Sequence, residues 1–182
     1  MTFRSSVPLL GLLSAALLAM ALAGCASGGA QPAAPGSPQM SVSSSPPAKP
    51  TLADVKPCDL LSSADRSTVG LTTIGAGKAI GAARACDWTA PGVFGVTITL
   101  DNAAGLADLK VAKKTATSAK VGAHDALRVS DKKAADGTCA VLLGVGEKGS
   151  AQVDVSNTNF TDTALACERA GTVAELIEPK LP

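Results

Sequence analysis

The sequence predicts an α+β fold, a single domain in which one antiparallel sheet carries packed N- and C-terminal helices and is stapled by two disulfides. Three observations lead to this class. Apolar and polar residues alternate along Phe94–Leu100, which is the period of a half-buried strand. Apolar residues recur at helical spacing from Ala164 to Ile177. Four cysteines besides Cys25 make an even set. The expected order is helix, hairpin, helix, strand, hairpin, helix, which is typical of α+β domains.

Residues 1–24 have the parts of a secretory signal, with Arg4 in the n-region and an apolar run from about Val7 to Leu22. A membrane-spanning helix needs roughly 20 apolar residues, and this run is shorter and contains Pro8. An ordinary cleaved signal would need only small residues at the cut. The stretch Leu22-Ala23-Gly24-Cys25 instead resembles the bacterial lipobox, in which the cysteine sulfur receives a diacylglyceryl group and cleavage follows before the cysteine.

Cys25 is therefore the predicted lipidation site, carrying palmitate-type acyl chains. Each buried CH₂ contributes roughly 0.8 kcal/mol, so two chains hold a protein stably where one binds only marginally. We expect the mature chain to be anchored by this lipid to the extracytoplasmic face of the cell membrane.

The composition excludes some classes of partner. The mean hydropathy of +0.27 is raised by the signal and does not indicate an integral membrane protein. The formal net charge is +1, and removal of Arg4 with the signal brings the mature chain to about zero, which argues against nucleic acid. Three Phe, one Trp and no Tyr disfavour sugar-binding and base-stacking surfaces.

Residues 25–50 are predicted to be the lipidated cysteine and a disordered tether rich in Pro, Ser, Gly and Ala. Such a sequence buries too little apolar surface to offset its ordering entropy. A coil of about 25 residues spans roughly 25–30 Å, enough to lift the domain off the membrane. The remaining residues, 51–182, suffice for one compact core.

The first half of this domain is predicted to hold a short helix and a hairpin. The helix runs from about Ser63 to Val69, with Ser62 and Asp65 forming a capping box. In Thr72–Ala85 the glycines do not have the spacing of a phosphate-binding loop, and we predict a flexible loop. Ala85–Thr89 and Val93–Asp101 are predicted to pair around a Pro-Gly turn.

The second half is predicted to continue with a short Lys-rich helix from about Gly105 to Lys114 and a polar connector over Thr115–Lys120. Val121–Val129 is predicted to be a turn that enters a strand. Cys139–Val145 and Ala151–Val155 form the second predicted hairpin. Gln152 and Asp154 predict that one face of its last strand is exposed to solvent. The C-terminal helix begins after Asp162 or Thr163 and ends at Pro179.

Cys58, Cys86, Cys139 and Cys167 favour two disulfides, because an exported domain folds in an oxidising compartment. A structural zinc site is the alternative, but these cysteines lack the short knuckles that such sites use. Three pairings are possible. We favour Cys58–Cys86, which ties the opening helix to the hairpin, and Cys139–Cys167, which ties a strand to the last helix. Each closure contributes roughly 3–4 kcal/mol by chain entropy.

The segments Pro57-Cys58-Asp59-Leu60-Leu61, Cys86-Asp87-Trp88 and Ala166-Cys167-Glu168-Arg169-Ala170 stand in the same order as in a family of actinobacterial lipoproteins classed as a domain of unknown function. The sequence resembles that family over Leu52–Pro182. The resemblance implies a lipid-anchored cell-envelope domain with paired cysteines. It implies no reaction and no catalytic residue.

No catalytic set stands out in the sequence. His124 is the only histidine, and adjacent Asp125 would point to the opposite face of a strand, so we expect His124 to be structural or exposed. Asp131 and Asp136 are predicted to be a solvated charge run in a turn, and Trp88 to pack in the core against a disulfide. We expect no enzyme activity, no metal site and no cofactor.

The sequence therefore favours a non-catalytic envelope binding module for a small apolar ligand, a wall component or an envelope protein. The alternatives are an accessory or sensory subunit of a membrane or cell-wall complex and, less favoured, a hydrolase. A large exposed apolar patch would favour the accessory subunit over a ligand cavity.

Overall fold

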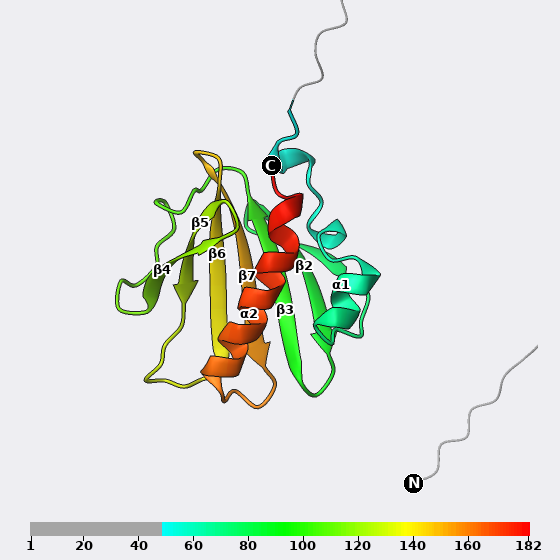
Figure 1. Ribbon diagram of the computed structural model, residues 1–182, viewed down its shortest axis with the longest axis vertical. Helices are drawn as coiled ribbons and strands as arrows, with labels where there is room; N and C mark the ends of the chain where they lie inside the picture. The colour runs from blue at the N-terminus through cyan, green and yellow to red at the C-terminus, as the bar shows by residue number, and fades with distance from the viewer. Residues whose placement is uncertain (1–48) are drawn as a thin grey trace, which may run out of the picture. The chain divides into compact units, whose positions relative to one another are not determined.

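The computed structural model describes residues 49–182, so the predicted signal peptide, Cys25 and nearly all of the tether lie outside the described residues. The domain is one seven-stranded antiparallel sheet with the strand order β1-β2-β3-β7-β6-β5-β4 (Figure 1). This sheet, a C-terminal helix and two disulfides confirm the core of the predicted fold class. The strands are β1 (Ala76–Ile80), β2 (Ala83–Ala90), β3 (Phe94–Asp101), β4 (Ala116–Val121), β5 (His124–Val129), β6 (Thr138–Val145) and β7 (Gly149–Asn157).

Helix α2 (Thr163–Ile177) crosses one face of the sheet, over β6 and β7 (Figure 1). Successive side chains of a strand point to opposite faces, and the alternating residues of β3 place Phe94, Val96, Ile98 and Leu100 in the core on this helix side. The helix buries most of the predicted stripe there, at Ala170, Val173, Ala174 and Ile177. At its start Ala166 is buried, whereas Ala164 is exposed and Cys167 is half-buried. Small alanines let the helix approach the sheet closely. Pro179 falls in the 3₁₀ helix η3 (Glu178–Lys180) that follows it.

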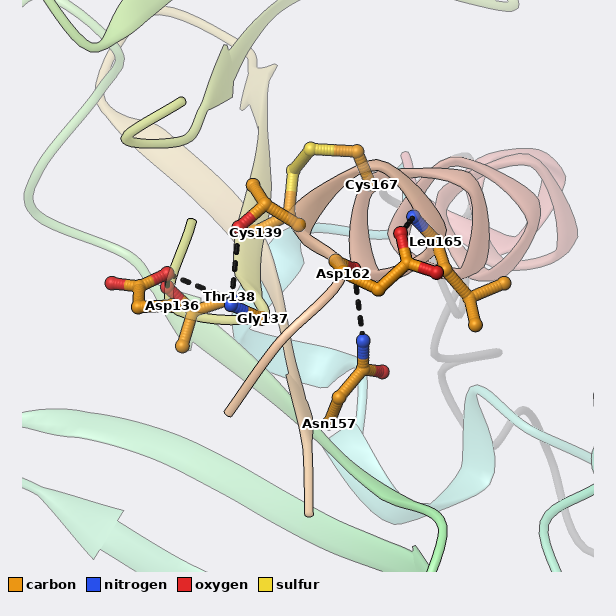
Figure 2. The surroundings of a disulfide bond; sticks show 9 residues. Asp136, Gly137, Thr138, Cys139, Asn157, Asp162, Leu165 and Cys167 are labelled. Carbon is orange, nitrogen blue, oxygen red and sulfur yellow. Dashed lines mark hydrogen bonds between the residues drawn. A yellow bond between two sulfur atoms is a disulfide. The ribbon is translucent and has the colours of Figure 1, made fainter. Parts of the chain in front are cut away.

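The disulfide Cys139–Cys167 ties β6 to α2, with a Cα–Cα distance of 4.9 Å (Figure 2). The helix begins beside it. Asp162 caps the first turn by accepting from the backbone N–H of Leu165 at 3.0 Å, and Thr163 Oγ1 accepts from Gly137 N–H at 3.0 Å. The covalent bond and these hydrogen bonds together fix the N-terminal end of α2 against the start of β6.

The second disulfide, Cys58–Cys86, ties the 3₁₀ helix η2 (Pro57–Asp59) to β2, with a Cα–Cα distance of 5.1 Å. Trp88 is fully buried on the same face of β2. A Cβ on Gly75 would lie 2.7 Å from Cys86 Sγ and 2.8 Å from Trp88 Nε1, so the chain passes directly over both groups and only glycine fits there. Both disulfides that the sequence favours are therefore formed, and Trp88 packs beside one of them.

The segment before the sheet is η1 (Leu52–Asp54), η2 and the short helix α1 (Ser63–Thr68). The predicted capping box is present, since Ser62 Oγ accepts from Asp65 N–H at 3.1 Å and Asp65 Oδ2 accepts from Ser62 N–H at 2.9 Å. None of the residues of α1 is itself buried. The flanking leucines, Leu60, Leu61 and Leu71, enter the core instead.

Asp65, near the start of the described domain, pairs with Lys180 near its end, which predicts an acid-sensitive contribution to stability. Lys180 Nζ lies 2.7 Å from Asp65 Oδ2. The hydrogen bond from Lys180, followed by that from Ser62, lowers the pKa of Asp65 from 3.8 to about 2. Because the pKa of Asp65 is lower in the folded protein than in the unfolded chain, its carboxylate stabilises the fold above pH 3.8. This contribution is lost as the pH falls toward 2. Because this pair is partly solvated, we expect Lys180→Met to cost roughly 1 kcal/mol at neutral pH.

Urea unfolding of the wild type and of Lys180→Met at pH 6 and pH 2 measures this effect. The difference in free energy of unfolding should shrink at low pH, leaving the part due to the second hydrogen bond of Lys180, to Leu60 O at 2.6 Å. A difference that does not depend on pH would show that the Asp65 carboxylate contributes nothing through Lys180.

Two sequence predictions about the edges of the sheet are wrong. Thr72–Ala85 is not a loop throughout, because Ala76–Ile80 forms edge strand β1, paired with β2. All five residues of β1 are exposed, so no hydrophobic alternation marks it. Thr115–Lys120 is not a connector, because Ala116–Val121 forms the opposite edge strand β4, which is polar and mostly exposed.

The helix predicted from about Gly105 to Lys114 is also absent, and the segment has turns instead. Asp108 Oδ2 accepts from Gly105 N–H at 3.0 Å, and Ser150 Oγ donates to Ala104 O at 2.7 Å. A Cβ on Gly144 would lie 3.2 Å from Leu106 Cδ1. The segment therefore lies against β6 and β7 on the side opposite α2, and the apolar spacing reflects this contact.

Candidate binding groove

The face of the sheet that α2 does not cover carries polar and small side chains. The strand register places Asp87 of β2 beside Thr97 of β3, Thr97 beside Asp154 of β7, and Asp154 beside Ala140 of β6. These four residues form one row across the sheet. We call this side the second face.

A groove of about 570 Å³ lies on the second face, within the size range of small-molecule sites. Its floor is the row just described, and its rim is the β5–β6 connection and the start of β4. Hydroxyl and carboxylate groups predominate among its polar side chains. The lining residues with such groups are Asp87, Thr89, Thr97, Thr115, Ser130, Asp131, Asp136, Thr138, Asp154 and Ser156.

One end of the groove is held by an ion pair. Lys78 Nζ reaches from the edge strand β1 to Asp87 Oδ2 at 2.6 Å. The other oxygen of Asp87, Oδ1, accepts from Thr97 Oγ1 at 2.6 Å. The carboxylate is thus fixed in orientation by two strands.

Asp154 lies on the floor of the groove and is partly buried. Burial raises the pKa of its carboxyl group, and the hydrogen bond from Gln152 and the charge of Lys78 oppose this rise. The amide Nε2 of Gln152 lies 2.8 Å from both carboxylate oxygens. Asp154 takes part in none of the four ion pairs formed among residues 49–182. The protein therefore keeps a carboxylate here without a cation in direct contact.

Asp131 and Asp136 lie at the rim, in the turn-rich connection between β5 and β6. Asp131 Oδ1 accepts from the N–H groups of Lys133 and Ala134, which lowers the pKa of this carboxyl group. Asp136 Oδ1 accepts from the N–H and the hydroxyl of Thr138. The predicted charge run is a structured turn whose carboxylates border the groove.

His124 lies away from the groove. Its Nδ1 is 2.7 Å from Gly144 O, and its Nε2 is 3.8 Å from Glu178 Oε1. The side chain of Asp125 pairs instead with Lys120 at 3.0 Å, as expected for the opposite face of the strand. Both nitrogens of the histidine ring thus face a carbonyl or a carboxylate, which favours the structural role expected from the sequence.

The groove was not predicted from the sequence, and the four disulfide cysteines predicted as site residues are structural. Asp87 and Asp154 come from strands far apart in the chain. One available signal was the polar face of the last predicted strand, with Gln152 and Asp154. The other was Cys86-Asp87-Trp88, in which strand alternation puts Asp87 on the face opposite the buried Cys86 and Trp88. Sequence periodicity alone does not show that both residues share one face.

Among residues 49–182, no three His, Cys, Asp or Glu side chains are grouped as metal ligands would be. Within the same range, none of the helices has the length and apolar character that crossing a bilayer requires.

Comparison with known proteins gives a family and nothing further. A family model described as "Protein of unknown function (DUF3558)" matches residues 20–180. No curated protein and no solved structure matches the chain.

Proposed function

Because the chain belongs to the DUF3558 family, whose members share no assigned activity, we propose from its own residues that it is a lipid-anchored, non-catalytic binding module of the bacterial cell envelope, of actinobacterial type. The observation that carries the binding function is the groove on the second face, with its partly buried Asp154. A carboxylate that burial disfavours is retained most simply where it meets a ligand.

The envelope location rests on two features that support each other. The lipobox-like stretch Leu22-Ala23-Gly24-Cys25 predicts export and lipidation. The two disulfides persist in oxidising compartments and are rare in the cytosol. In this proposal residues 1–24 are removed, Cys25 carries the lipid, and residues up to 50 tether the domain.

The non-catalytic assignment rests on the groove's chemistry. The single histidine, His124, is engaged by Gly144 and Glu178 outside the groove, so it forms no histidine-activated nucleophile there. Thr97 donates to Asp87 in the groove, but this carboxylate is held in an ion pair with Lys78. The carboxylates at the groove are held by hydroxyl, amide and backbone donors, which suits recognition of a ligand.

A second candidate function is that of an accessory or sensory subunit of an envelope complex. Val93 and Phe160 are large apolar residues with 50% and 68% of their surface exposed. They lie in neighbouring turns, since Thr158 N–H donates to Val93 O at 3.0 Å. An exposed apolar pair of this kind suits a contact with another protein.

Replacement of Cys25 tests the anchored location. When bacterial membranes that contain the protein are extracted with a phase-separating detergent, the mature chain is expected to enter the detergent phase. Its N-terminal peptide should begin at Cys25 and carry a diacylglyceryl group. Cys25→Ala should lose the lipid and the detergent-phase partition, because no other acylated residue remains. Intact-mass and peptide mass spectrometry measure both.

The matched control is Ser27→Ala, which leaves the predicted lipidation site unchanged and should behave as the wild type. A wild-type chain that retains residues before Cys25, or that is cut without gaining lipid, would contradict the anchored location.

A further inference from the structure

Strand β1 leaves one edge of the sheet open. It stands at one end of the strand order, so its outer backbone N–H and C=O groups pair with no strand among residues 49–182. All five of its residues are exposed. An open edge of this kind is a template for another strand, and proteins usually protect it with unpaired charges, a proline or a covering segment.

The only charged residue of β1 does not protect this edge. Lys78 Nζ lies 2.6 Å from Asp87 Oδ2 on the neighbouring strand β2, so the ammonium group is already paired within the sheet. The other residues of the strand are Ala, Gly and Ile, and none is a proline. The outer edge of β1 therefore lacks the features that discourage pairing with another strand.

Two exposed isoleucines stand at the ends of this edge and on one face. Of the four large apolar side chains that are exposed among residues 49–182, Ile74 (84%) and Ile80 (47%) lie at β1, and none lies on the other edge strand, β4. Strand alternation places Ile80 on the same face as Lys78, which is the second face. A Cβ on Gly75 would point at the disulfide on the other side, so Ile74 beside it also points to the second face.

We propose that β1 pairs with β1 of a second copy of this chain, antiparallel and in the register that places Gly77 opposite Gly77 of the second copy. Ile74 and Ile80 are each three residues from Gly77, so Ile74 of either copy then lies opposite Ile80 of the other. An apolar pair forms on each side of the two-fold axis. The two seven-stranded sheets continue as one. This pairing goes beyond the proposed binding function and does not depend on what the groove binds.

Charge favours the same register. Lys78 lies opposite Ala76 of the second copy, and Ala76 pairs within its own chain with Asp87. Each Lys78 thus shares a row with Asp87 of the other copy, and ammonium and carboxylate groups alternate around the axis. The register centred on Lys78 keeps the same faces but sets two ammonium groups opposite each other, which is unfavourable. The second copy also brings a cation toward Asp87, at one end of the groove.

Two strands of five residues make a small interface. Stable complexes bury roughly 1,200–2,000 Å², so we expect a weak dimer that dissociates on dilution. Anchoring of both chains in one membrane, as proposed above, would raise their effective concentration and favour the pair.

Cysteine cross-linking of the full-length protein in non-ionic detergent tests this pairing. Chains with Ala76→Cys are mixed with differently tagged chains with Lys78→Cys, and the oxidised product that carries both tags is measured on a non-reducing gel. Directly opposite residues of paired strands lie within reach of a disulfide, whereas two copies of one variant place their cysteines two residues apart, beyond a Cα–Cα distance of about 7 Å. We therefore expect the mixture to cross-link severalfold more than either variant alone.

The matched control is the mixture of Ser118→Cys and Lys120→Cys chains at the opposite edge. These positions also hold a small residue and a lysine, two residues apart on the exposed edge strand β4. We expect little cross-linking there. Equal product at the two edges, or more product from Lys78→Cys chains alone than from their mixture with Ala76→Cys, would overturn the proposed pairing.

Sedimentation equilibrium in density-matched detergent tests the apolar contact without new cysteines. Ile80→Lys should raise the dissociation constant of the dimer by about tenfold or more, because it removes both isoleucine pairs and adds two charges at the edge. Val93→Lys is the control, since Val93 has a similar exposure of 50% but lies in the β2–β3 turn. Equal effects of the two substitutions, or a wild type that stays monomeric at the concentrations used for cross-linking, would overturn the assignment of a second copy to this edge.

Discussion

Replacing both cysteines of the Cys139–Cys167 disulfide by alanine is expected to lower the free energy of unfolding by about 3–4 kcal/mol. The bond spans 28 residues, and its main effect is to restrict the unfolded chain. The loss should be large because the bond also fixes the start of α2 on the sheet (Figure 2). The helix contributes a whole stripe of buried residues to the core. Urea unfolding of the oxidised wild type and the double variant measures the difference.

The other disulfide provides the matched comparison, because Cys58–Cys86 also spans 28 residues and has the same chain-entropy term. Any difference between the two double variants therefore reports on the folded state. We expect the larger loss for Cys58→Ala with Cys86→Ala, since Cys86 is completely buried beside Trp88 and its removal leaves a cavity there. A loss below about 1 kcal/mol in either variant would show that the chain-entropy account of these bonds is wrong.

The sequence predicted the parts of the fold in which burial imposes a period. β3 alternates without exception between buried and half-buried residues, and α2 shows its stripe at helical spacing. Cys139–Cys167 joins a strand and a helix that the pattern had already identified, whereas Cys58 lies in the 3₁₀ helix η2, which the pattern did not predict. The edge strands were missed for the converse reason: β1 is wholly exposed and rich in Gly and Ala, and β4 is polar, so neither carries a hydrophobic signal.

The segment from Gly105 to Lys114 shows the limit of apolar spacing in short stretches. Leu106 and Leu109 are three residues apart, as on a helix, but Asp108 bonds the backbone of Gly105 and closes a turn. Aspartate side chains compete with helices in this way. Packing of Leu106 against Gly144 then satisfies its apolar side chain without a helix. Nothing local in the sequence distinguishes these two outcomes.

The groove depends on strand order, which the sequence does not state. Asp87 and Asp154 become neighbours across β3 only because β7 pairs with β3. A sheet with the same strands in another order would separate them. The polar alternation of β7 is visible in the sequence and correctly indicates that one side of the strand faces solvent. Which strands pair with β7, and so make this side part of a groove, is set by the sheet topology.

Gly137→Ala is expected to be the most destabilising single substitution among the glycines in turns. Gly137 has φ of +68°, where side chains other than glycine cost about 1–2 kcal/mol. A Cβ there would also lie 2.5 Å from Thr161 O and 2.6 Å from Thr161 N. These are backbone atoms, which cannot rotate aside as a side chain can. We therefore expect a loss of roughly 3–5 kcal/mol in free energy of unfolding.

The control is Gly146→Ala. Gly146 has a similar φ of +63° in the β6–β7 turn, but a Cβ there would meet no atom within 4 Å. Its substitution should cost only the backbone term, about 1–2 kcal/mol. The difference between the two variants isolates the clash with Thr161.

That clash is costly because the segment around Thr161 is held on both sides. Asn157 Nδ2 donates to Thr161 O and to Asp162 O, each at 2.9 Å, and Thr163 Oγ1 accepts from Gly137 N–H itself. Movement of Thr161 would break these bonds and disturb the cap of α2. If both glycine variants lose the same stability in urea unfolding, the segment yields freely, and the start of α2 is fixed by the disulfide alone.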